Sequence, residues 1–285
     1  MTLTASRISG YLNAHGEIRL HARALLDAHH AFPRLSSVFT TEQRAMMASI
    51  IMALYFDSRT GTQRGGVVLA RFLDQVEARG VASRNTADKF IKEMIQYGFL
   101  RSFHARGDRR VRPLEPTETT LAGFVAWGMA HLGTLDRFDN GTRCATVRNN
   151  PGQLLKLQPL LQGYLVGDGG EAVYSETLGL FAWVNNSKLL TLRILAGMGD
   201  LDPATDRIPT DIESISELAK WMGVSKTHLS RKMREAEEIG SIGWNDRRGH
   251  SPMWISASFL REMLDEVAER LATFAAAYSI VFPDV

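Results

Sequence analysis

Two stretches of the sequence place cationic and small polar side chains on one face of an expected helix. The first face holds Arg84, Asn85, Asp88, Lys89 and Lys92, and the second holds Lys226, Thr227, Ser230, Arg231 and Arg234. At the helical period of about 100° per residue, each set spans about 140° of arc. Long cations reach phosphate oxygens, and amides and hydroxyls form hydrogen bonds with base edges. Each face therefore has the chemistry of a nucleic-acid contact, although a merely solvated helix face has the same composition.

The two faces belong to an internal repeat with an offset of 142 residues, the separation of Ser83 from Ser225. At the same offset Gly98 matches Gly240 and Gly107 matches Gly249, so that a helix cap, a helix terminator and a hairpin-tip glycine coincide without a gap. The matched apolar pairs are Ala87 with Leu229, Ile91 with Met233, Met94 with Ala236, Tyr97 with Ile239, and Leu100 with Ile242. We expect helices at residues 83–97 and 225–239, each with its apolar positions turned to a core.

The neighbouring elements repeat as well. Each expected helix follows another helix across a tight turn, Gly80-Val81 in the first copy and Gly223-Val224 in the second, and each precedes a hairpin with a basic tip. The tip cations are Arg106, Arg109, Arg110 and Arg112 in the first hairpin, and Arg247, Arg248 and His250 in the second. Between Ser83 and Arg112 the sequence has eight Lys and Arg residues against three Asp and Glu residues, in a chain whose formal net charge is +2. This local excess predicts a surface for a polyanion.

A helix-turn-helix followed by a β-hairpin resembles the winged-helix fold. The block SRNTADKFIKEMIQYGFLRSFHARGDRRVRPLEPTE resembles the recognition helix and wing of MarR-type transcriptional regulators. The resemblance implies that Asp108 orients an arginine, that Arg109 or Arg110 enters a minor groove, and that Thr117 begins the next helix. The block from Ser214 to Ser256 resembles a more general bacterial winged helix. Tandem winged helices also occur in plasmid replication initiators and chromosome-segregation adaptors.

The length of 285 residues fits two domains at the usual size of about 150 residues. We expect a mainly α chain with two winged helix-turn-helix domains, each a three-helix core plus a β-hairpin wing, joined by a helical connector. The expected parts are an N-terminal arm with a short helix at 1–40, the first winged helix at 41–135, the connector at 136–186, the second winged helix at 187–257, and a C-terminal helix at 258–285. MarR-type regulators carry one winged helix per chain, so their ligand pocket and dimer geometry are not transferred to this chain.

The C-terminal helix has an apolar seam with 4-3-4-3-4 spacing, formed by Leu260, Leu264, Val267, Leu271, Phe274 and Tyr278. Such a seam either packs on its own domain or pairs with a second copy of the chain. We expect its first turns to pack internally and the remainder to form a homodimer contact.

The composition excludes several classes of protein. With 45% hydrophobic and 22% charged residues, the chain has the composition of a globular protein rather than a disordered one. A single cysteine, Cys144, can form neither an intrachain disulfide nor a thiolate zinc site, and this favours a reducing compartment. The apolar run 45–56 is shorter than the roughly 20 residues of a membrane span, and the N-terminus has no signal-peptide pattern. We therefore expect a cytoplasmic protein without a membrane contact.

An enzyme has little support in the sequence. The glycine-rich segment 61–66 lacks the Lys-Ser/Thr ending of a phosphate-binding loop, and no nucleophile motif surrounds Cys144. The histidines His21, His29 and His30 lack a carboxylate or thiol at metal-ligand spacing. We expect no catalysis, no cofactor and no metal.

The leading expectation is sequence-specific binding of double-stranded DNA by a transcriptional regulator. Expected base contacts come from Asn85, Thr86 and Thr227; expected base or phosphate contacts come from Arg84, Lys89, Lys92, Lys226, Ser230, Arg231 and Arg234; expected wing contacts come from Arg106, Arg109, Arg110, Arg247 and Arg248. Two alternatives stay open: a winged-helix scaffold that binds protein, in which Glu235, Glu237 and Glu238 would mask the cations, and a plasmid-type replication initiator. The sequence leaves the effector ligand and the oligomeric state open.

Overall fold

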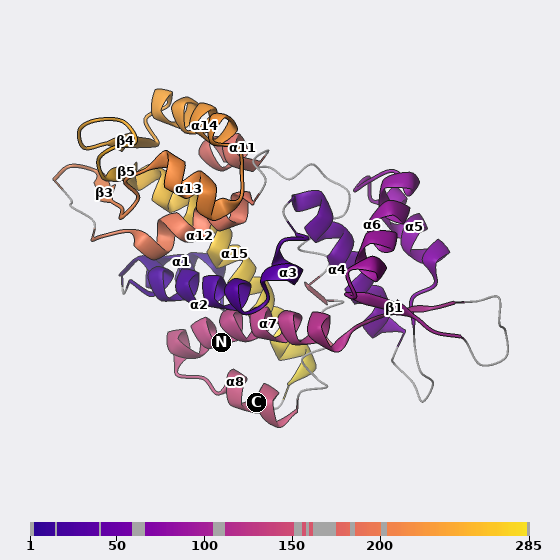
Figure 1. Cartoon of the computed structure of the whole chain (residues 1–285). Helices are drawn as coiled ribbons and strands as arrows, with labels where there is room; N and C mark the ends of the chain where they lie inside the picture. The colour runs from indigo at the N-terminus through magenta and orange to yellow at the C-terminus, as the bar shows by residue number, and fades with distance from the viewer. Residues whose placement is uncertain are drawn as a thin grey trace. The chain divides into compact units, whose positions relative to one another are not determined.

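The structure is a computed structural model that describes residues 3–14, 16–39, 41–58, 66–104, 112–150, 156–157, 160–161, 175–182, 186–200 and 204–283. The chain is mainly helical, as expected, with two small antiparallel sheets (Figure 1). It divides into two compact units, one formed by Met1–Asp27 with Val173–Ala272, and the other by Ala28–Ala172 with Thr273–Val285. The ranges 41–135 and 187–257 fall in different units, whereas the expected N-terminal arm and C-terminal helix are each divided between the two.

The N-terminal segment contains three helices, so the expected arm with one short helix is wrong. They are α1 (Ala5–Ala14), α2 (Glu17–Ala31) and α3 (Pro33–Ser36). Ile8, Leu12 and Ile18 are almost completely buried, which shows that α1 and α2 pack into a core. Ile8 and Leu12 have the i,i+4 spacing of a helical stripe, but polar neighbours conceal it in the sequence.

The first of two similar modules lies within residues 42–116. Its elements are α4 (Glu42–Asp57), the bridge residue Val67, α5 (Leu69–Ala78), α6 (Arg84–Gln96), β1 (Leu100–Ser102) and β2 (Leu114–Pro116). Ser83 begins α6 by accepting a hydrogen bond from the Thr86 amide at 3.3 Å, a cap that satisfies one free amide of the first turn. Ile50, Phe72 and Ile91 are buried in its core. The core thus fixes α6 by one side and leaves its polar side outward.

The second module lies within residues 187–256. Its elements are α12 (Ser187–Gly197), β3 (Arg207–Pro209), α13 (Ile215–Met222), α14 (Lys226–Glu238), β4 (Ile242–Trp244) and β5 (Met253–Ser256). Ser225 begins α14 by accepting a hydrogen bond from the His228 amide at 3.4 Å. Gly223 ends α13 in the left-handed conformation, with φ of 68°, which glycine adopts without strain. This turn directs the chain from α13 into α14.

The structure confirms the helices expected from the repeat. α6 and α14 begin and end at the same 142-residue offset, and so do β1 and β4. Gly98 and Gly240 follow the two helices with φ of 73° and 75°. The strand order is also shared: β3 pairs with β5, which pairs with β4, and Val67 bridges to Leu114 of β2, which pairs with β1. Each module therefore runs helix, extended segment, helix, helix and hairpin, with the extended segment beside the last strand.

One matched apolar pair does not face a core. Tyr97 and Ile239 are 54% and 42% exposed, although the periodicity placed them on the buried side. Both are the C-cap residues of their helices, where the chain leaves the packed face. The other helix pairs of the repeat, beginning with Ala87 and Leu229, are buried as expected.

The segment between the modules is helical in the part that the structure describes. α7 (Glu118–Asp139) runs past the expected domain end at 135, and α8 (Arg143–Asn149) and α11 (Glu176–Ala182) follow it. Most of residues 151–174 of the expected connector lie outside the described residues.

The long helix α15 (Ala257–Val281) buries its apolar seam inside the chain. All six seam residues, Leu260, Leu264, Val267, Leu271, Phe274 and Tyr278, are buried. The Phe274 ring stacks on His131 with centroids 4.4 Å apart, and Tyr278 stacks on Phe282 with centroids 4.6 Å apart. The expectation that the second half of this seam pairs with another copy is therefore wrong.

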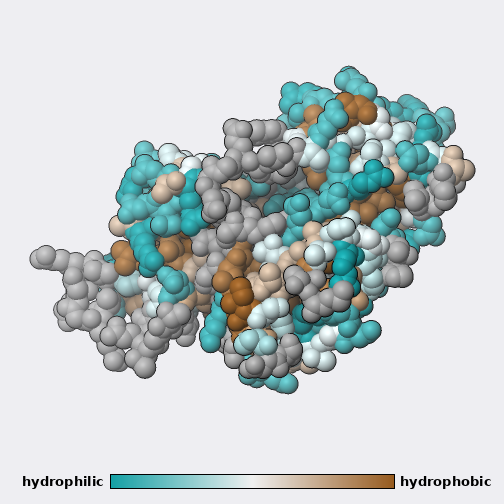
Figure 2. All heavy atoms as spheres, turned by 180° about the vertical axis from the view of Figure 1, so that it is seen from behind, coloured by the Kyte–Doolittle hydropathy of each residue, from teal (hydrophilic) through white to brown (hydrophobic). Residues whose placement is uncertain are grey.

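The surface mixes hydrophilic residues with small apolar patches, as the face drawn in Figure 2 shows. Tyr97, Trp221 and Ile280 are among the large apolar side chains that stay exposed. Within the described ranges, the helices all fall short of the combined length and apolar character that a membrane span requires.

Candidate nucleic-acid interface

Helix α14 exposes the side chains expected to contact nucleic acid. Lys226, Thr227, Arg231 and Arg234 are all exposed. Among the described residues, Arg231 has two weak polar neighbours, the Glu235 carboxylate at 4.0 Å and a ring nitrogen of His228 at 3.4 Å. Within the described part of the chain, Lys226 and Arg234 take part in no ion pair. These three cations are thus available to an external anion.

Arg248 is held by the protein instead. Its Nε donates to both oxygens of Glu237 at 2.8 Å, its Nη1 donates to the Ser230 hydroxyl at 3.2 Å, and its Nη2 donates to the Ser230 carbonyl at 2.9 Å. Trp244 Nε1 also donates to Glu237, at 3.0 Å. Arg248 and Ser230, both expected as DNA contacts, are thus bonded to each other within the protein, and this cluster fastens the second hairpin to α14. Arg247, one residue earlier, is exposed.

The acidic residues of α14 do not mask its exposed cations. Glu235 accepts from Lys232 Nζ at 2.7 Å, and Glu237 is occupied by the hairpin. Glu238 is exposed near the end of the helix. Among the described residues, Lys226 and Arg234 therefore have no ion-pair partner, and Arg231 has the Glu235 carboxylate at 4.0 Å.

Helix α6 exposes the same kinds of side chain, but two of its cations are paired. Arg84 Nη1 donates to Asp74 Oδ1 at 2.5 Å and to Glu77 Oε2 at 3.2 Å, both on α5. These carboxylates, Asp74 first, raise the pKa of Arg84. Lys92 Nζ lies 2.6 Å from Asp88 Oδ2, one helical turn away.

The remaining polar residues of this face are open. Asn85, Thr86 and Lys89 are exposed, and Asn85 and Lys89 have no polar contact within the described ranges. The α6 face therefore offers an amide and a cation for base contacts but carries less uncompensated charge than α14.

The first hairpin is described only in part. Arg106, Arg109 and Arg110, together with Asp108, lie outside the described residues. Nearer the strands, Arg101 Nε donates to the buried carboxylate of Glu115 at 2.7 Å, across the β1–β2 pair. Arg112 is exposed.

The carboxylates that decide which cations are free were not predicted from the sequence. Asp74 and Glu77 form an i,i+3 acidic pair on the exposed side of α5, a spacing that was visible in the sequence. Lys220, exposed on α13, was also missed. Aligning the two turns, Gly80 with Gly223, would have shown that Lys220 takes the place of Glu77.

The described residues offer little for catalysis or metal binding. Cys144 on α8 has its Sγ 3.8 Å from the Met129 carbonyl, and burial, with the nearby Asp136 carboxylate, raises its pKa to about 11. The thiolate is the reactive form, so this cysteine is poorly suited to nucleophilic chemistry at neutral pH. No group of three or more His, Cys, Asp and Glu side chains is arranged to hold a metal ion in the portion described.

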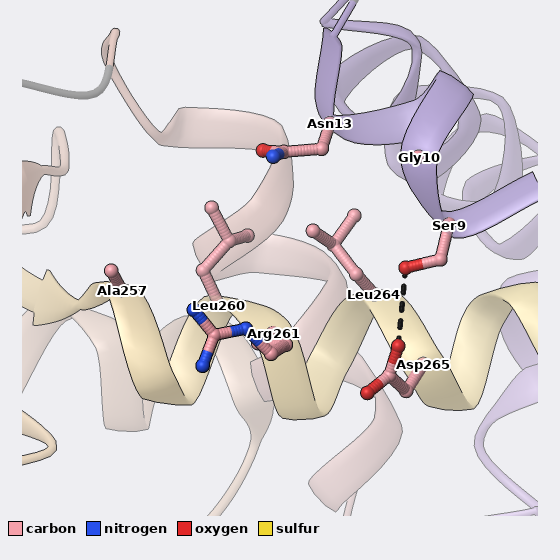
Figure 3. Close-up of a pocket in the computed structure, with 8 residues that line it drawn as sticks. All are labelled: Ser9, Gly10, Asn13, Ala257, Leu260, Arg261, Leu264 and Asp265. Carbon is pink, nitrogen blue, oxygen red and sulfur yellow. Dashed lines mark hydrogen bonds between the residues drawn. The ribbon is translucent and has the colours of Figure 1, made fainter. Parts of the chain in front are cut away.

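A cavity of about 240 Å³ lies between α1 and the first turns of α15 (Figure 3). Leu260 and Leu264 line it, and the Ser9 hydroxyl donates to Asp265 Oδ1 at 3.1 Å across one side. The lining contains neither histidine nor cysteine. The serine therefore has no imidazole there to act as its general base.

Comparison of the chain with protein-family models, curated proteins and solved structures found no match.

Proposed function

We propose that this chain binds double-stranded DNA through two winged-helix modules and acts as a sequence-specific transcriptional regulator. The observation that carries the proposal is the α14 face, where Lys226, Arg231 and Arg234 are exposed and largely uncompensated beside the exposed Arg247 of the hairpin. The element order of each module, with its extended segment next to the last strand of the hairpin, supports the winged-helix assignment.

The geometry suits a helix in the major groove. In helix-turn-helix proteins the first residues of the second helix meet base edges, and cations along it meet phosphates. In α14 the first turn carries Lys226 and Thr227, and the next two turns carry Arg231 and Arg234. In α6 the first turn carries Asn85 and Thr86, which are the expected base contacts. Because the two faces differ in residue type, one chain would read an asymmetric site.

A salt titration of the full chain tests the proposal. Fluorescence anisotropy with a labelled duplex of about 30 base pairs gives the association constant between about 50 and 200 mM salt. We expect its logarithm to fall linearly with the logarithm of salt concentration, with a slope of about −0.9 for each phosphate contact. Arg234→Ala should remove about one phosphate contact and so make this slope less steep by about 0.9.

Arg261→Ala is the matched control. Arg261 is an exposed arginine of the same unit, located on α15 rather than α14. Its removal should leave the slope unchanged. Absence of salt-dependent duplex binding by the wild-type chain would refute the proposal and favour the protein-binding scaffold. A replication initiator would share the DNA contacts and differ in the genomic position of its sites.

A further inference from the structure

The two modules differ in the charge that they offer to DNA at one specific place. When Gly80 is aligned with Gly223, Asp74 of α5 corresponds to Glu217 of α13, and Glu77 corresponds to Lys220. The first module therefore has two carboxylates where the second has one carboxylate and one ammonium group. Both positions lie on the helix that precedes the proposed recognition helix.

The cation at the start of the next helix forms ion pairs in the first module but not in the described part of the second. Arg84, the first residue of α6, binds Asp74 at 2.5 Å and Glu77 at 3.2 Å. Its counterpart Lys226, the first residue of α14, takes part in no ion pair among the described residues. At equivalent positions of the repeat, Arg84 is thus neutralised by carboxylates of its own module, whereas Lys226 is not.

Carboxylate and phosphate oxygens bind a guanidinium in the same way, through charge-assisted hydrogen bonds. Asp74 and Glu77 therefore compete with DNA phosphates for Arg84. Their side chains are 64% and 58% exposed, so they also present negative charge directly to an approaching phosphate backbone. Both effects weaken phosphate binding by α6. In the second module Glu217 keeps a negative charge at one of the two positions, but it forms no ion pair with Lys226 among the described residues.

We propose that the second module anchors the chain to DNA, and that Asp74 and Glu77 act as an electrostatic brake on the first module by occupying Arg84. The first module then adds base contacts from residues such as Asn85 while contributing little to non-specific affinity. This inference rests on the proposed DNA binding and assigns two residues, Asp74 and Glu77, that set the balance between specific and non-specific binding.

Release of the brake is the direct test. We expect the Asp74→Asn/Glu77→Gln variant of the full chain to bind a mixed-sequence duplex roughly three- to tenfold more tightly at about 100 mM salt. Its slope against the logarithm of salt concentration should be steeper by about 0.9, the value of one added phosphate contact. Arg84→Ala in the wild-type background should change affinity less than about twofold, whereas Lys226→Ala should reduce the steepness by about one contact.

A double-mutant cycle separates the brake from a general charge effect. Adding Arg84→Ala to Asp74→Asn/Glu77→Gln should remove most of the gain in affinity, because Arg84 is the group that is released, and should leave only the part due to direct repulsion of phosphates by the two carboxylates. Asp57→Asn is the matched control: Asp57 is an exposed acid of the same module that binds Arg71 at 3.1 Å. It should raise affinity by less than about twofold and leave the slope unchanged. Circular dichroism melts check that each variant is folded.

The outcomes distinguish this inference from the proposed function. If the wild-type chain binds duplex DNA but Arg84→Ala weakens it as much as Lys226→Ala, the brake is refuted and DNA binding stands. A gain in affinity that persists undiminished without Arg84 refutes the brake in the same way. If the wild-type chain shows no salt-dependent binding, both the proposed function and the inference fail.

Discussion

Alanine substitutions of the adjacent arginines Arg247 and Arg248 should have different effects, one on DNA binding and the other on the free energy of unfolding. In sequence both belong to the same basic hairpin tip, but Arg247 is exposed while the Arg248 side chain is 32% exposed and bound to Glu237 and Ser230. Hydrogen bonds to charged groups contribute about 1.5–3 kcal/mol when buried. Because this cluster is partly exposed and its bonds are not additive, we expect Arg248→Ala to lower the free energy of unfolding by about 2 kcal/mol.

Equilibrium urea unfolding followed by circular dichroism measures this loss. With a denaturant dependence of about 2 kcal/mol per molar, the midpoint should fall by about 1 M. Arg247→Ala should shift the free energy of unfolding by less than about 0.5 kcal/mol, since its exposed side chain has no such contacts with the residues that the structure describes.

The DNA-binding assay should rank the two variants differently. Arg247→Ala should reduce the steepness of the salt dependence by about one contact, as expected for a lost phosphate interaction. Equal losses of stability in the two variants, or a loss confined to Arg247→Ala, would refute the assignment of Arg248 to the hairpin anchor.

Three further predictions concern stability and reactivity. Gly98→Ala and Gly240→Ala should each lower the free energy of unfolding by about 1–2 kcal/mol in thermal melts, because both glycines have positive φ. The space around both is open, so no steric clash adds to this backbone cost, and unequal costs would count against the structural repeat. Cys144, whose pKa is raised to about 11, should react slowly with a disulfide reagent at pH 7 and faster above pH 10, and rapid labelling of the folded chain at pH 7 would contradict its burial. The hydrogen bond from Arg143 lowers the pKa of Asp139 from its ordinary value, so this pair stabilises the fold fully at pH above that ordinary value and loses its effect as pH falls through the folded-state pKa. Asp139→Asn should therefore cost about 1 kcal/mol at pH 7 in urea unfolding and progressively less below pH 4, and a cost independent of pH would contradict the ion-pair assignment.

Local signals made much of each module predictable. Ser83 and Ser225 are caps with strong helix-starting preference, and Gly98 and Gly240 stop the helices because they adopt positive φ. The repeat reinforced these signals, since the same cap, stripe and stop recur at a fixed offset. The polar faces of α6 and α14 followed from helical period alone.

Long-range contacts were not predictable in the same way. The sequence could not show that Arg84 meets Asp74 and Glu77 or that Arg248 meets Glu237, because these pairs depend on how helices and hairpins pack. The partner of the apolar seam of α15 was ambiguous for a related reason. An apolar stripe indicates that a helix face is buried, but it does not indicate which element or which chain covers it.

Selection of bound duplexes from a random-sequence pool by the full chain tests DNA recognition most directly. We expect enrichment of an asymmetric two-part motif, one part lost on Asn85→Ala and the other on Thr227→Ala, because the two helices present different side chains to the bases. A pool that stays unenriched, while the folded wild-type chain binds every duplex equally or none, would contradict sequence-specific recognition by these two helices.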